Sequence, residues 1–330
     1  MNDFYERTGK LPVLVVFAPT ACGKTDLALD MFGKNSKSLL AGRAEIISAD
    51  SMQIYKGMDI GTAKPDKKVL EELPHHLIDI NTPDQPFSVG DFVRCSDELC
   101  REIYFRGKLP VVLGGTGFYV RSFILGLPAT PQADMVLRGT LKERLEKEGA
   151  EKLYAELVEL DSVSACNIHP NDHYRILRAL EVFHASGKPR SSFLLQQKKR
   201  DGYDFCTIIL ERDRTQLYER INARVDEMLE KGLSQEFDNL VAAGYDETCP
   251  GMQAIGYREF FDQEVCSATS DDERISIVRK LVAKDSRHYA KRQYTFMRGI
   301  PGALHFPADS FDEIKSFIIT SFERFGLFSY

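Results

Sequence analysis

The stretch LPVLVVFAPTACGKT, residues 11–25, decides the fold of this 330-residue chain. Its apolar run from Val13 to Phe17 has the length and composition of a buried strand. A short turn follows, and Gly23-Lys24-Thr25 leads into the helix-like segment 26–29. A strand, a tight turn and a helix in this order form the setting in which backbone N–H groups surround a phosphate. We therefore predict an α/β fold whose first strand ends at a phosphate loop.

The predicted loop contains eight consecutive residues that would surround a di- or triphosphate: Ala18, Pro19, Thr20, Ala21, Cys22, Gly23, Lys24 and Thr25. In such a loop the lysine places its charge on the phosphates and the threonine hydroxyl can bind Mg²⁺, so Thr25 is the candidate metal ligand. Ala18 replaces the first glycine of the usual pattern, so the turn must avoid a positive φ there or accept strain. Cys22, beside a lysine at a helix N-terminus, is expected to have a lowered pKa. The alternative is a chance Gly-Lys-Thr sequence.

Three further apolar runs have strand length: Ile46–Ala49, Val111–Leu113 and Thr207–Leu210. Helix-like segments separate the first three strands, and this alternation is typical of a parallel sheet flanked by helices. Asp50 follows the second strand and Thr116 follows the third, within a glycine-rich segment. Because ligands bind at the carboxyl ends of parallel strands, both residues should share one crevice with the phosphate loop. For Asp50 the alternatives are a helix N-cap or an aspartate that reaches Mg²⁺ through water; for the glycines, a tight helix entry.

The segment between the third and fourth strands differs in composition and periodicity from the rest of the chain. Residues 141–148 and 154–160 are charged with helical periodicity, and no strand candidate occurs there. Prolines punctuate the start of the segment, and Gly187 and Pro189 its end. We predict an all-helical insertion domain at 128–199, and a catalytic core made of 11–127 and 200–330. The chain after the fourth strand is predicted to be mainly helical and to end in a polar, proline-containing tail.

The composition is that of an ordinary globular chain, with 43% hydrophobic and 28% charged residues. Its seven cysteines contain no C-x-x-C pair, which favours reduced thiols over a disulfide framework or a zinc site. No signal peptide pattern is visible, and no stretch approaches the roughly 20 apolar residues that span a bilayer. We therefore expect a cytoplasmic protein with no membrane partner. The formal net charge of −6 argues, as an average, against a nucleic acid partner.

Seven sequence blocks, taken in order, resemble the tRNA dimethylallyltransferase family of bacterial type, also called tRNA isopentenyltransferases or IPP transferases. They are the phosphate loop and residues 48–65 (SADSMQIYKGMDIGTAKP), 75–79 (HHLID), 113–119 (LGGTGFY), 172–181 (DHYRILRALE), 253–259 (QAIGYRE) and 292–298 (RQYTFMR). Four positions depart from the family's commonest pattern: Ala18, Cys22, Met52 and Phe296. The departures leave Lys24, Thr25, Asp50 and Thr116 in place, so an active enzyme is expected.

The resemblance implies a P-loop NTPase-like fold and transfer of a dimethylallyl group from dimethylallyl diphosphate to N6 of the adenosine 3′ of the anticodon in tRNAs, giving N6-isopentenyladenosine. The phosphate loop would then hold the leaving diphosphate, with Mg²⁺ as the cofactor. An adenine amine is a weak nucleophile, so a carboxylate should accept its proton. Asp50 matches the family's aspartate and takes that role, and Thr116 matches a threonine that orients the base or the diphosphate. We expect a monomer.

Arg224 is a third catalytic candidate, reached from helical geometry. Leu217, Ile221 and Val225 recur at one-face spacing, and Arg224 projects onto the edge of that face. A charged group aimed at the body of the protein needs an anionic partner. The family has an arginine here that contacts the diphosphate. Spacing alone equally allows an aliphatic stem along the surface with the guanidinium in water.

Candidates for tRNA contact also come from the resemblance, because the adenosine must leave its stack to enter a crevice. They are Asp50, Ser51, Met52, Gln53 and Thr116 beside the crevice, and Arg138, Tyr174, Arg175, Ile176, Leu177 and Arg178 in the insertion. Arg175 and Arg178 lie three residues apart on a predicted helix and would both face outward. The alternative is that they are ordinary solvated arginines.

Local charge supports an RNA partner without reference to the family. Residues 274–298 contain eight basic residues and one acid, a balance of +7, so the rest of the chain carries −13. Lys280, Lys284, Arg287, Lys291 and Arg298 share one helical direction, which predicts a basic stripe. A solvated face normally mixes signs, so we favour a track for the phosphate backbone, with Lys284, Arg287 and Lys291 as its contacts.

Three rival functions remain open on sequence alone. A prenyltransferase acting on free adenine nucleotides would share the chemistry but would not need the insertion or the basic stripe. A P-loop small-molecule kinase would need neither Asp50 beside Thr116 nor an RNA track. A catalytically inactive RNA-binding protein is the non-enzymatic alternative, suggested by the departures in the phosphate loop.

Overall fold

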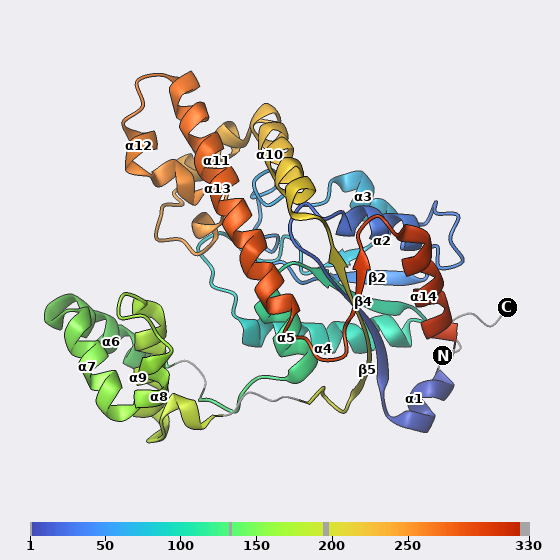
Figure 1. Cartoon of the computed structure of the whole chain (residues 1–330), viewed down its shortest axis with the longest axis horizontal. Coiled ribbons are helices and arrows are strands. Elements are labelled where there is room, and N and C mark those ends of the chain that lie inside the picture. Colours follow the sequence, from blue (N-terminus) through green and yellow to red (C-terminus); the bar gives the residue numbers. More distant parts are fainter. Residues whose placement is uncertain (1, 132–133, 194–197, 324–330) are drawn as a thin grey trace. The chain divides into compact units, whose positions relative to one another are not determined.

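The computed structural model describes residues 2–131, 134–193 and 198–323. Within these ranges six parallel strands form one sheet in the order β3-β2-β4-β1-β5-β6 (Figure 1). Their bounds are β1 Leu11–Phe17, β2 Ala44–Ser48, β3 His75–His76, β4 Leu109–Gly114, β5 Tyr203–Glu211 and β6 Leu304–Pro307. β1 lies in the middle and pairs with β4 on one side and β5 on the other, so the loop after it emerges at the centre of the sheet edge.

Helices flank the sheet, and α10 and α13 lie against each other beyond its carboxyl edge. The helices of this part are α1 Asn2–Thr8, α2 Lys24–Phe32, α3 Lys67–Glu72, α4 Val89–Phe105, α5 Gly117–Leu125, α10 Arg214–Glu230, α11 Leu233–Ala242, α12 Gln263–Cys266, α13 Asp271–Met297 and α14 Phe311–Glu323. Every residue of β1, β2 and β4 is buried, as expected of strands that are covered on both faces. Among the described residues no helix is both long and apolar enough to cross a membrane.

The α/β fold with a parallel sheet flanked by helices is confirmed. All four predicted strands are present, although Ala49 lies one residue beyond β2. β3 and β6 escaped prediction because β3 has two residues and β6 is mostly exposed at the sheet edge. The predicted polar tail is wrong. Residues 311–323 form α14, which buries Ile314, Ile318 and Phe322 in the core beside the sheet.

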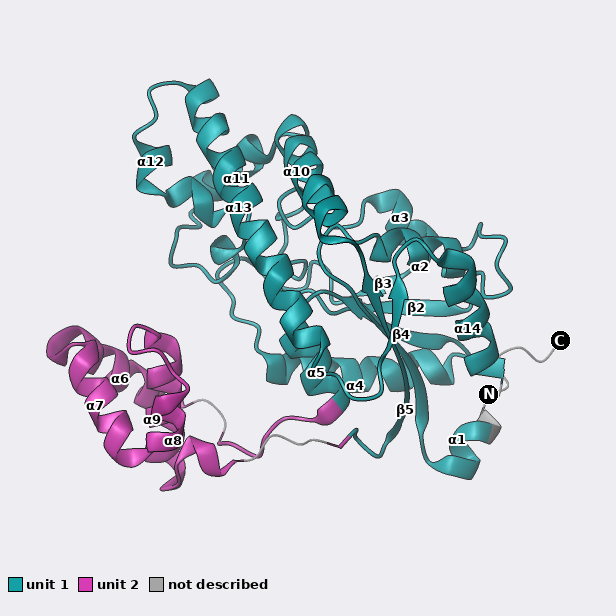
Figure 2. Ribbon diagram, in the orientation of Figure 1, with its two compact units in different colours: residues 1–124, 199–330 teal, residues 125–198 magenta. Residues whose placement is uncertain are grey.

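The chain divides into two compact units (Figure 2). Unit 1 comprises residues 1–124 and 199–330, and unit 2 comprises residues 125–198. Unit 2 contains α6 Met135–Glu148, α7 Ala150–Leu160, α8 Ser162–Cys166 and α9 His173–Ser186. Its own core is formed by Leu141, Leu153, Leu157, Ile176 and Leu180, which explains how residues 125–198 form a compact body. The predicted insertion, 128–199, overlaps this unit.

Glu45 on β2 ties the sheet to the end of α4. Its side chain is 9% exposed, and its carboxylate lies 2.7 Å from His76 Nε2, 2.7 Å from Arg106 Nη2 and 3.1 Å from Lys108 Nζ. Burial alone would raise the pKa of Glu45, but these hydrogen bonds lower it from 4.5 to about 2. Because the folded-state pKa is depressed, the stabilisation is complete above pH 4.5 and is lost as the pH falls from there toward 2.

We expect Glu45→Gln to lower the free energy of unfolding at pH 7 by about 2 kcal/mol, because it removes the buried carboxylate that pairs with the partly exposed Arg106 and Lys108; solvent screening keeps the loss below the full value of the pKa shift. Urea denaturation at pH 7 and at pH 3 measures this, and the difference from wild type should shrink at the lower pH. Glu102→Gln is the matched control, since that exposed carboxylate lies 3.6 Å from the same Arg106. An equal loss at both pH values would contradict the electrostatic explanation.

Candidate active site

The phosphate loop accommodates Ala18 without strain. Ala18 is fully buried, its N–H donates to the Gly114 carbonyl at 3.2 Å, and its φ is not positive. The left-handed conformations instead occur at Ala21, with φ 59°, and at Gly23, with φ 100°. The missing first glycine is therefore not a defect of this loop, because the turn takes its positive φ angles three and five residues later.

Cys22 is a structural residue and not a reactive thiol. Its side chain is 1% exposed, and its sulfur donates to the Leu210 carbonyl at 3.7 Å. Burial raises the pKa of this thiol, and the nearby charges of Arg212 and Lys24 lower it by less. The predicted lowering of its pKa is wrong, because the turn points the sulfur into the core beneath the loop.

A cavity of about 840 Å³ opens over the loop, and we call it the phosphate-loop cavity. Ala21, Gly23, Lys24 and Thr25 line one side of it, and Arg220 and Arg224 of α10 line the other. Burial lowers the pKa of Lys24, the charge of Arg224 lowers it further, and Asp50 opposes the shift. Cations this close to each other disfavour one another's protonated form, and a bound anion relieves that repulsion. The cavity is therefore suited to a phosphorylated ligand.

Arg224 stands between this cavity and a second one. Its Nη1 donates to Thr20 Oγ1 at 3.4 Å, and burial lowers its pKa despite the nearby carboxylate of Asp50. The guanidinium thus faces the loop and not the solvent, as helical geometry predicted. Arg224 and Met228 line both cavities, so the two spaces meet at this face of α10.

The second cavity, which we call the Asp50 cavity, measures about 240 Å³. Apolar side chains from α10 and α13 form much of its wall: Ile221, Val225, Met228 and Val282, together with Ile255. Polar groups gather at Asp50, Ser51, Tyr289 and Arg292. An apolar pocket with a few placed polar groups is typical of a site for a flat or partly apolar ligand.

Asp50 combines a structural contact with a free oxygen. Its Oδ1 accepts the N–H groups of Met52 at 2.9 Å and Gln53 at 3.4 Å, while Oδ2 has no hydrogen bond within the described ranges. The N-cap-like role considered from sequence is therefore present, but it occupies one oxygen. The other is available to accept a proton from a ligand in the Asp50 cavity.

Thr116 acts on the segment that follows Asp50. Its Oγ1 accepts the Ser51 N–H at 3.0 Å and donates to Ser51 Oγ at 3.3 Å. The nearby hydroxyl of Tyr289 donates to the Gly115 carbonyl at 3.3 Å. Burial, and then the charge of Asp50, raise the pKa of Tyr289 to about 12, so its hydroxyl stays protonated at neutral pH. Thr116 thus fixes Ser51, which lines the cavity.

Gln293 of α13 joins the phosphate loop to the glycine-rich segment. Its Oε1 accepts the Thr20 N–H at 3.0 Å, and its Nε2 donates to the Gly115 carbonyl at 2.6 Å. A Cβ atom on Gly115 would lie 2.4 Å from Gln293 Nε2, and one on Gly114 would lie 2.2 Å from the Ala49 carbonyl. The absence of a Cβ atom at Gly114 and Gly115 therefore makes room for Ala49 and Gln293. As a result the phosphate loop, the segment before Asp50 and the glycine-rich segment pack together at one edge of the sheet.

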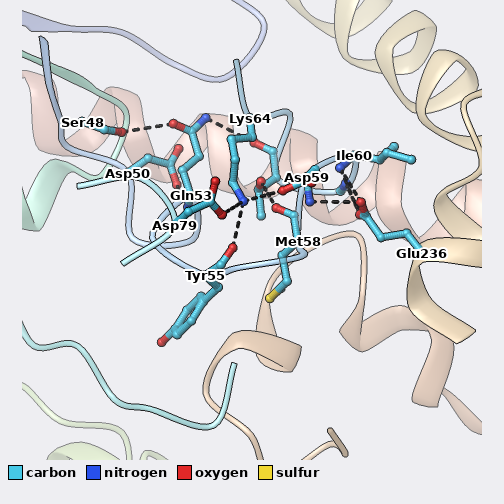
Figure 3. Close-up of polar contacts among 12 residues, drawn as sticks. Ser48, Asp50, Gln53, Tyr55, Met58, Asp59, Ile60, Lys64, Asp79 and Glu236 are labelled. Atoms are coloured by element: carbon cyan, nitrogen blue, oxygen red, sulfur yellow. Dashed lines mark hydrogen bonds and ion pairs between the residues drawn. The ribbon is translucent and has the colours of Figure 1, made fainter. Parts of the chain in front are cut away.

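The loop that follows Asp50 is closed by Lys64 (Figure 3). Its ammonium lies 2.8 Å from the Tyr55 carbonyl, 2.5 Å from Asp59 Oδ1 and 2.6 Å from Asp79 Oδ1, and its side chain is 4% exposed. All three ammonium protons thus have acceptors. Lys64 also lines the phosphate-loop cavity, so the group that closes the loop forms a wall of the site.

Glu236 of α11 holds the same loop from the other side (Figure 3). Its carboxylate accepts the N–H groups of Asp59, Ile60 and Gly61 at 2.9–3.2 Å, and the Tyr257 hydroxyl at 2.5 Å. Consecutive backbone N–H groups that converge on one carboxylate give a strong, charge-assisted set of bonds. The loop between Asp50 and Lys64 is therefore fixed to the helical layer as well as to the sheet.

Gln53 makes hydrogen bonds within the loop that follows Asp50. It is 9% exposed, its Oε1 accepts from Ser48 Oγ at 3.1 Å, and its Nε2 donates to the carbonyls of Thr62 and Ala63 at 3.4 and 3.3 Å. The prediction that Gln53 contacts tRNA is therefore not supported for its side chain, because both ends of the amide already have partners. Met52, by contrast, lines the Asp50 cavity, as does Ser51.

Lys64→Met should disturb the site more than its distance from Asp50 suggests. The change leaves Asp59 and Asp79 without their shared cation, so we expect a loss of stability of about 2 kcal/mol. Displacement of the loop should lower the catalytic rate roughly 10-fold. Thermal unfolding and turnover measure the two effects. Lys67→Met, which removes an exposed lysine from the same cavity, is the control, and equal behaviour of the two variants would refute the positioning role.

The uncompensated positive charge on α13 is smaller than the charge count predicted. Arg274 pairs with Asp238 at 2.7 Å, and Arg279 pairs with Asp226 at 3.0 Å. Arg287 donates to Asn222 Oδ1 at 2.7 Å. Lys280, Lys284 and Lys291 are exposed and have no ion pair among the described residues. The uncompensated charge therefore lies on these three lysines and on Arg292 and Arg298, which follow them.

In unit 2 the candidates for RNA contact separate into exposed and buried groups. Tyr174 is 71% exposed, and the Arg138 guanidinium lies 5.8 Å from its ring centroid, so the two form one surface. Arg175 is exposed and pairs with Asp172 at 3.1 Å. Ile176 is 1% exposed within the core of unit 2, so its side chain is not accessible to RNA.

Arg178 and Leu177 also differ from the prediction. The prediction that Arg178 faces outward with Arg175 is wrong, because its guanidinium lies 2.9 Å from Glu181 Oε1 and 2.8 Å from the Pro131 carbonyl. Leu177 is half-buried against the core of unit 2. The helix turns these side chains inward, and Tyr174 and Arg175 remain as the exposed members of the segment.

The residues present fit a hydrated divalent ion better than a protein-caged one. The structure, over the ranges that it describes, contains no cluster of three or more His, Cys, Asp or Glu side chains suited to a metal. Thr25, the candidate ligand, lines the phosphate-loop cavity. Mg²⁺ typically takes few protein ligands and completes its octahedron with phosphate oxygens and water. A hydroxyl beside a phosphate site matches this donor set.

Several site residues escaped the sequence reasoning: Tyr289, Arg292, Gln293, Lys64 and Glu236. The first three lie on α13 but outside the residues of the predicted basic stripe. Their positions within or beside the quoted blocks 48–65 and 292–298 were the available signal for all except Glu236. Glu236 lies in an ordinary amphipathic helix pattern, and nothing local distinguishes it.

Comparison with known proteins agrees with this geometry. Residues 53–300 match the family described as IPP transferase. The chain is 39% identical over 316 residues to the tRNA dimethylallyltransferase of Geobacter sulfurreducens, covering 95% of this chain and 97% of the relative. It is 44% identical over 296 residues to that of Bacillus subtilis, covering 88% of each chain. The crystal structure of a tRNA isopentenylpyrophosphate transferase from Bacillus halodurans is similar with a TM-score of 0.64 and 36% identity, covering 96% and 97% of the two chains. The chain therefore belongs to the IPP transferase family.

Proposed function

We propose that this enzyme transfers the dimethylallyl group of dimethylallyl diphosphate to N6 of the adenosine 3′ of the anticodon in tRNAs, giving N6-isopentenyladenosine. The single observation that carries the proposal is the meeting of two cavities at Arg224. One contains the phosphate loop and the other contains Asp50. A donor with an anionic diphosphate and an apolar chain suits this pair of spaces, with its reactive carbon near the boundary.

In the proposed reaction the adenine N6 attacks C1 of the dimethylallyl group. The new C–N bond forms, the C1–O bond breaks with its electron pair going to the diphosphate, and the N6 proton passes to Asp50 Oδ2. Lys24, Arg224 and the backbone N–H groups of the loop stabilise the charge that builds on the diphosphate. Thr116 holds Ser51 and so orients the segment that faces the adenine.

Thr25 would hold Mg²⁺ beside the diphosphate, together with ligand oxygens and water. When bound, the ion supplies further neutralisation of the leaving group. Lys24 still provides a fixed protein charge at the loop. The protein's own contribution is therefore to hold the diphosphate and to stabilise the charge that builds on it.

Each unit contributes its own proposed tRNA contacts. In unit 1 it includes Ser51, Met52, Lys284, Arg287 and Lys291. In unit 2 we propose an RNA-contacting role for the insertion through Arg138, Tyr174 and Arg175. Tyr174 and Arg175 are exposed, whereas Arg138 is half-buried, lies 3.6 Å from Glu181 Oε2 and rests against the Tyr174 ring. An aromatic ring beside a guanidinium is a platform on which an unstacked base can lie. The reaction is assigned to the cytoplasm because unmodified tRNA is its acceptor, and the monomeric state stays a prediction.

The rival functions are separated by one labelling experiment. Protein and Mg²⁺ are incubated with radiolabelled dimethylallyl diphosphate and either unmodified tRNA or AMP. We expect label in the tRNA alone, at the adenosine 3′ of the anticodon. Label in AMP alone would establish a nucleotide prenyltransferase, and label in neither would favour an inactive RNA-binding protein. The kinase alternative predicts phosphoryl transfer from ATP with no use of the prenyl donor.

A further inference from the structure

The Asp50 cavity holds an excess of positive charge that the proposed chemistry does not use. Its lining residues include the guanidinium groups of Arg224, Arg258 and Arg292, and the single carboxylate of Asp50. Under the proposed function Arg224 belongs to the diphosphate, because it contacts the phosphate loop and lines both cavities. The other two arginines need a separate explanation.

Arg258 is neutralised by the protein itself. Its Nη2 is hydrogen-bonded to Asp285, and its Nε lies 3.2 Å from Glu259 Oε1. Glu259 is 4% exposed and also accepts the Gly256 N–H at 2.7 Å. Arg258 is therefore part of an ion-pair network that holds the 256–259 segment against α13. It has no spare charge for a ligand.

Arg292 is the guanidinium without an anion. It is exposed, and no carboxylate of the described ranges lies within ion-pair distance of it. Its Cζ lies 5.7 Å from the centroid of the Tyr289 ring, which holds the side chain against the wall of the Asp50 cavity. An arginine that both lines a cavity and is exposed lies where that cavity meets the solvent. Lys291, its neighbour, is exposed but does not line the cavity.

We propose that Arg292 binds a phosphodiester flanking the target adenosine when that nucleotide turns out of the anticodon loop into the Asp50 cavity. This inference rests on the proposed function. A base that enters the cavity must bring its two flanking phosphates to the opening. The planar guanidinium can donate two parallel hydrogen bonds to phosphate oxygens, a geometry that lysine cannot match. Arg292 would thus select a nucleotide within a chain and hold it while Asp50 removes the proton.

The test is a double-mutant cycle that combines a protein variant with a modified RNA. The substrates are an anticodon stem-loop and two versions in which the phosphate 5′ or 3′ of the target adenosine is a neutral methylphosphonate. We expect one methylphosphonate to lower kcat/KM of the wild type for RNA roughly 10- to 100-fold, the value of a charged hydrogen bond. Arg292→Met should show the same loss with natural RNA and no further loss with that methylphosphonate. The KM for dimethylallyl diphosphate should not change.

Lys291→Met is the matched comparison, because it removes an equal charge from a proposed tRNA contact that does not line the cavity, and it should therefore lower kcat/KM for all three RNAs by the same factor. It should retain the full methylphosphonate penalty. Equilibrium binding of the same RNAs gives a second readout that does not depend on turnover. If the Arg292→Met and methylphosphonate losses multiply, the inference is overturned although the proposed function stands. If the wild type does not prenylate the natural stem-loop or tRNA, the proposed function fails and the inference fails with it.

Discussion

Asp50→Asn should reduce kcat for prenyl transfer roughly 10²- to 10⁴-fold, the range expected when a general base is lost, while the Kd for tRNA stays unchanged. An asparagine Oδ1 can still accept the N–H groups of Met52 and Gln53, so the turn that follows should be preserved. The amide at the other position cannot accept a proton from the adenine amine. Single-turnover transfer from radiolabelled dimethylallyl diphosphate measures the rate, and filter binding measures the affinity.

Asp50→Ala is the informative comparison because it removes the structural contact as well as the base. We expect it to lose most turnover, to retain tRNA binding, and to unfold about 1 kcal/mol more easily than the asparagine variant, the usual value of one capping group. The difference between the two variants therefore isolates the turn. A variant that loses tRNA affinity and keeps its turnover would reassign Asp50 from catalysis to recognition.

The central part of the fold could be predicted because its signals are local. β1, the loop and α2 follow one another within residues 11–32, and β1, β4 and β5 each contain a continuous apolar run. Elements at the periphery lack such signals. β3 is defined by its partner and not by its two residues, and α14 continues a segment that begins with polar residues and prolines. Burial of Ile318 in the core beside the sheet stabilises α14, and the local sequence pattern does not reveal that burial.

The site was predictable where one segment carries the chemistry, and not where distant segments meet. The phosphate loop and Asp50 follow the ends of β1 and β2, so the topology of a parallel sheet places both at one edge. Gln293 reaches Thr20 across 273 residues, and Glu236 reaches Ile60 across 176. Such partners depend on how helices pack over the sheet, which residue spacing does not encode.

The charge pattern on α13 shows the same limit. Its balance of +7 located a helix that lines the Asp50 cavity, so the distribution of charge was more informative than the net value of −6. The count overstated the free charge of the helix, because Arg274 and Arg279, which lie outside the predicted stripe, are neutralised by acids of α11 and α10. Conversely, Arg292 lies off the predicted stripe and is the arginine of this helix that lines the cavity. Sequence therefore identifies the helix, and packing identifies its functional side chains.

Lys24→Met should lower kcat roughly 10²- to 10³-fold, since it removes a fixed charge where the leaving diphosphate becomes more negative. The KM for dimethylallyl diphosphate should rise by a smaller factor, because Arg224 and the backbone N–H groups still bind the ground state. Lys231→Met is the control. That exposed lysine lines the same cavity but lies 3.8 Å from Glu227, away from the loop. Equal kcat values for Lys24→Met and wild type would remove Lys24 from the mechanism.

The pH dependence offers an independent test of the same residue. Burial and the charge of Arg224 lower the pKa of Lys24 from 10.5, so the free enzyme loses this charge at a lower pH than an ordinary lysine. Only the protonated form attracts the diphosphate, and kcat/KM for dimethylallyl diphosphate reports the free enzyme. It should therefore fall on the alkaline side before pH 10.5 is reached. Lys24→Arg keeps its charge throughout this range and should remove the alkaline decline, even where the larger side chain lowers the plateau. An unchanged decline in that variant would assign the titration to another group, because the arginine at position 24 does not deprotonate.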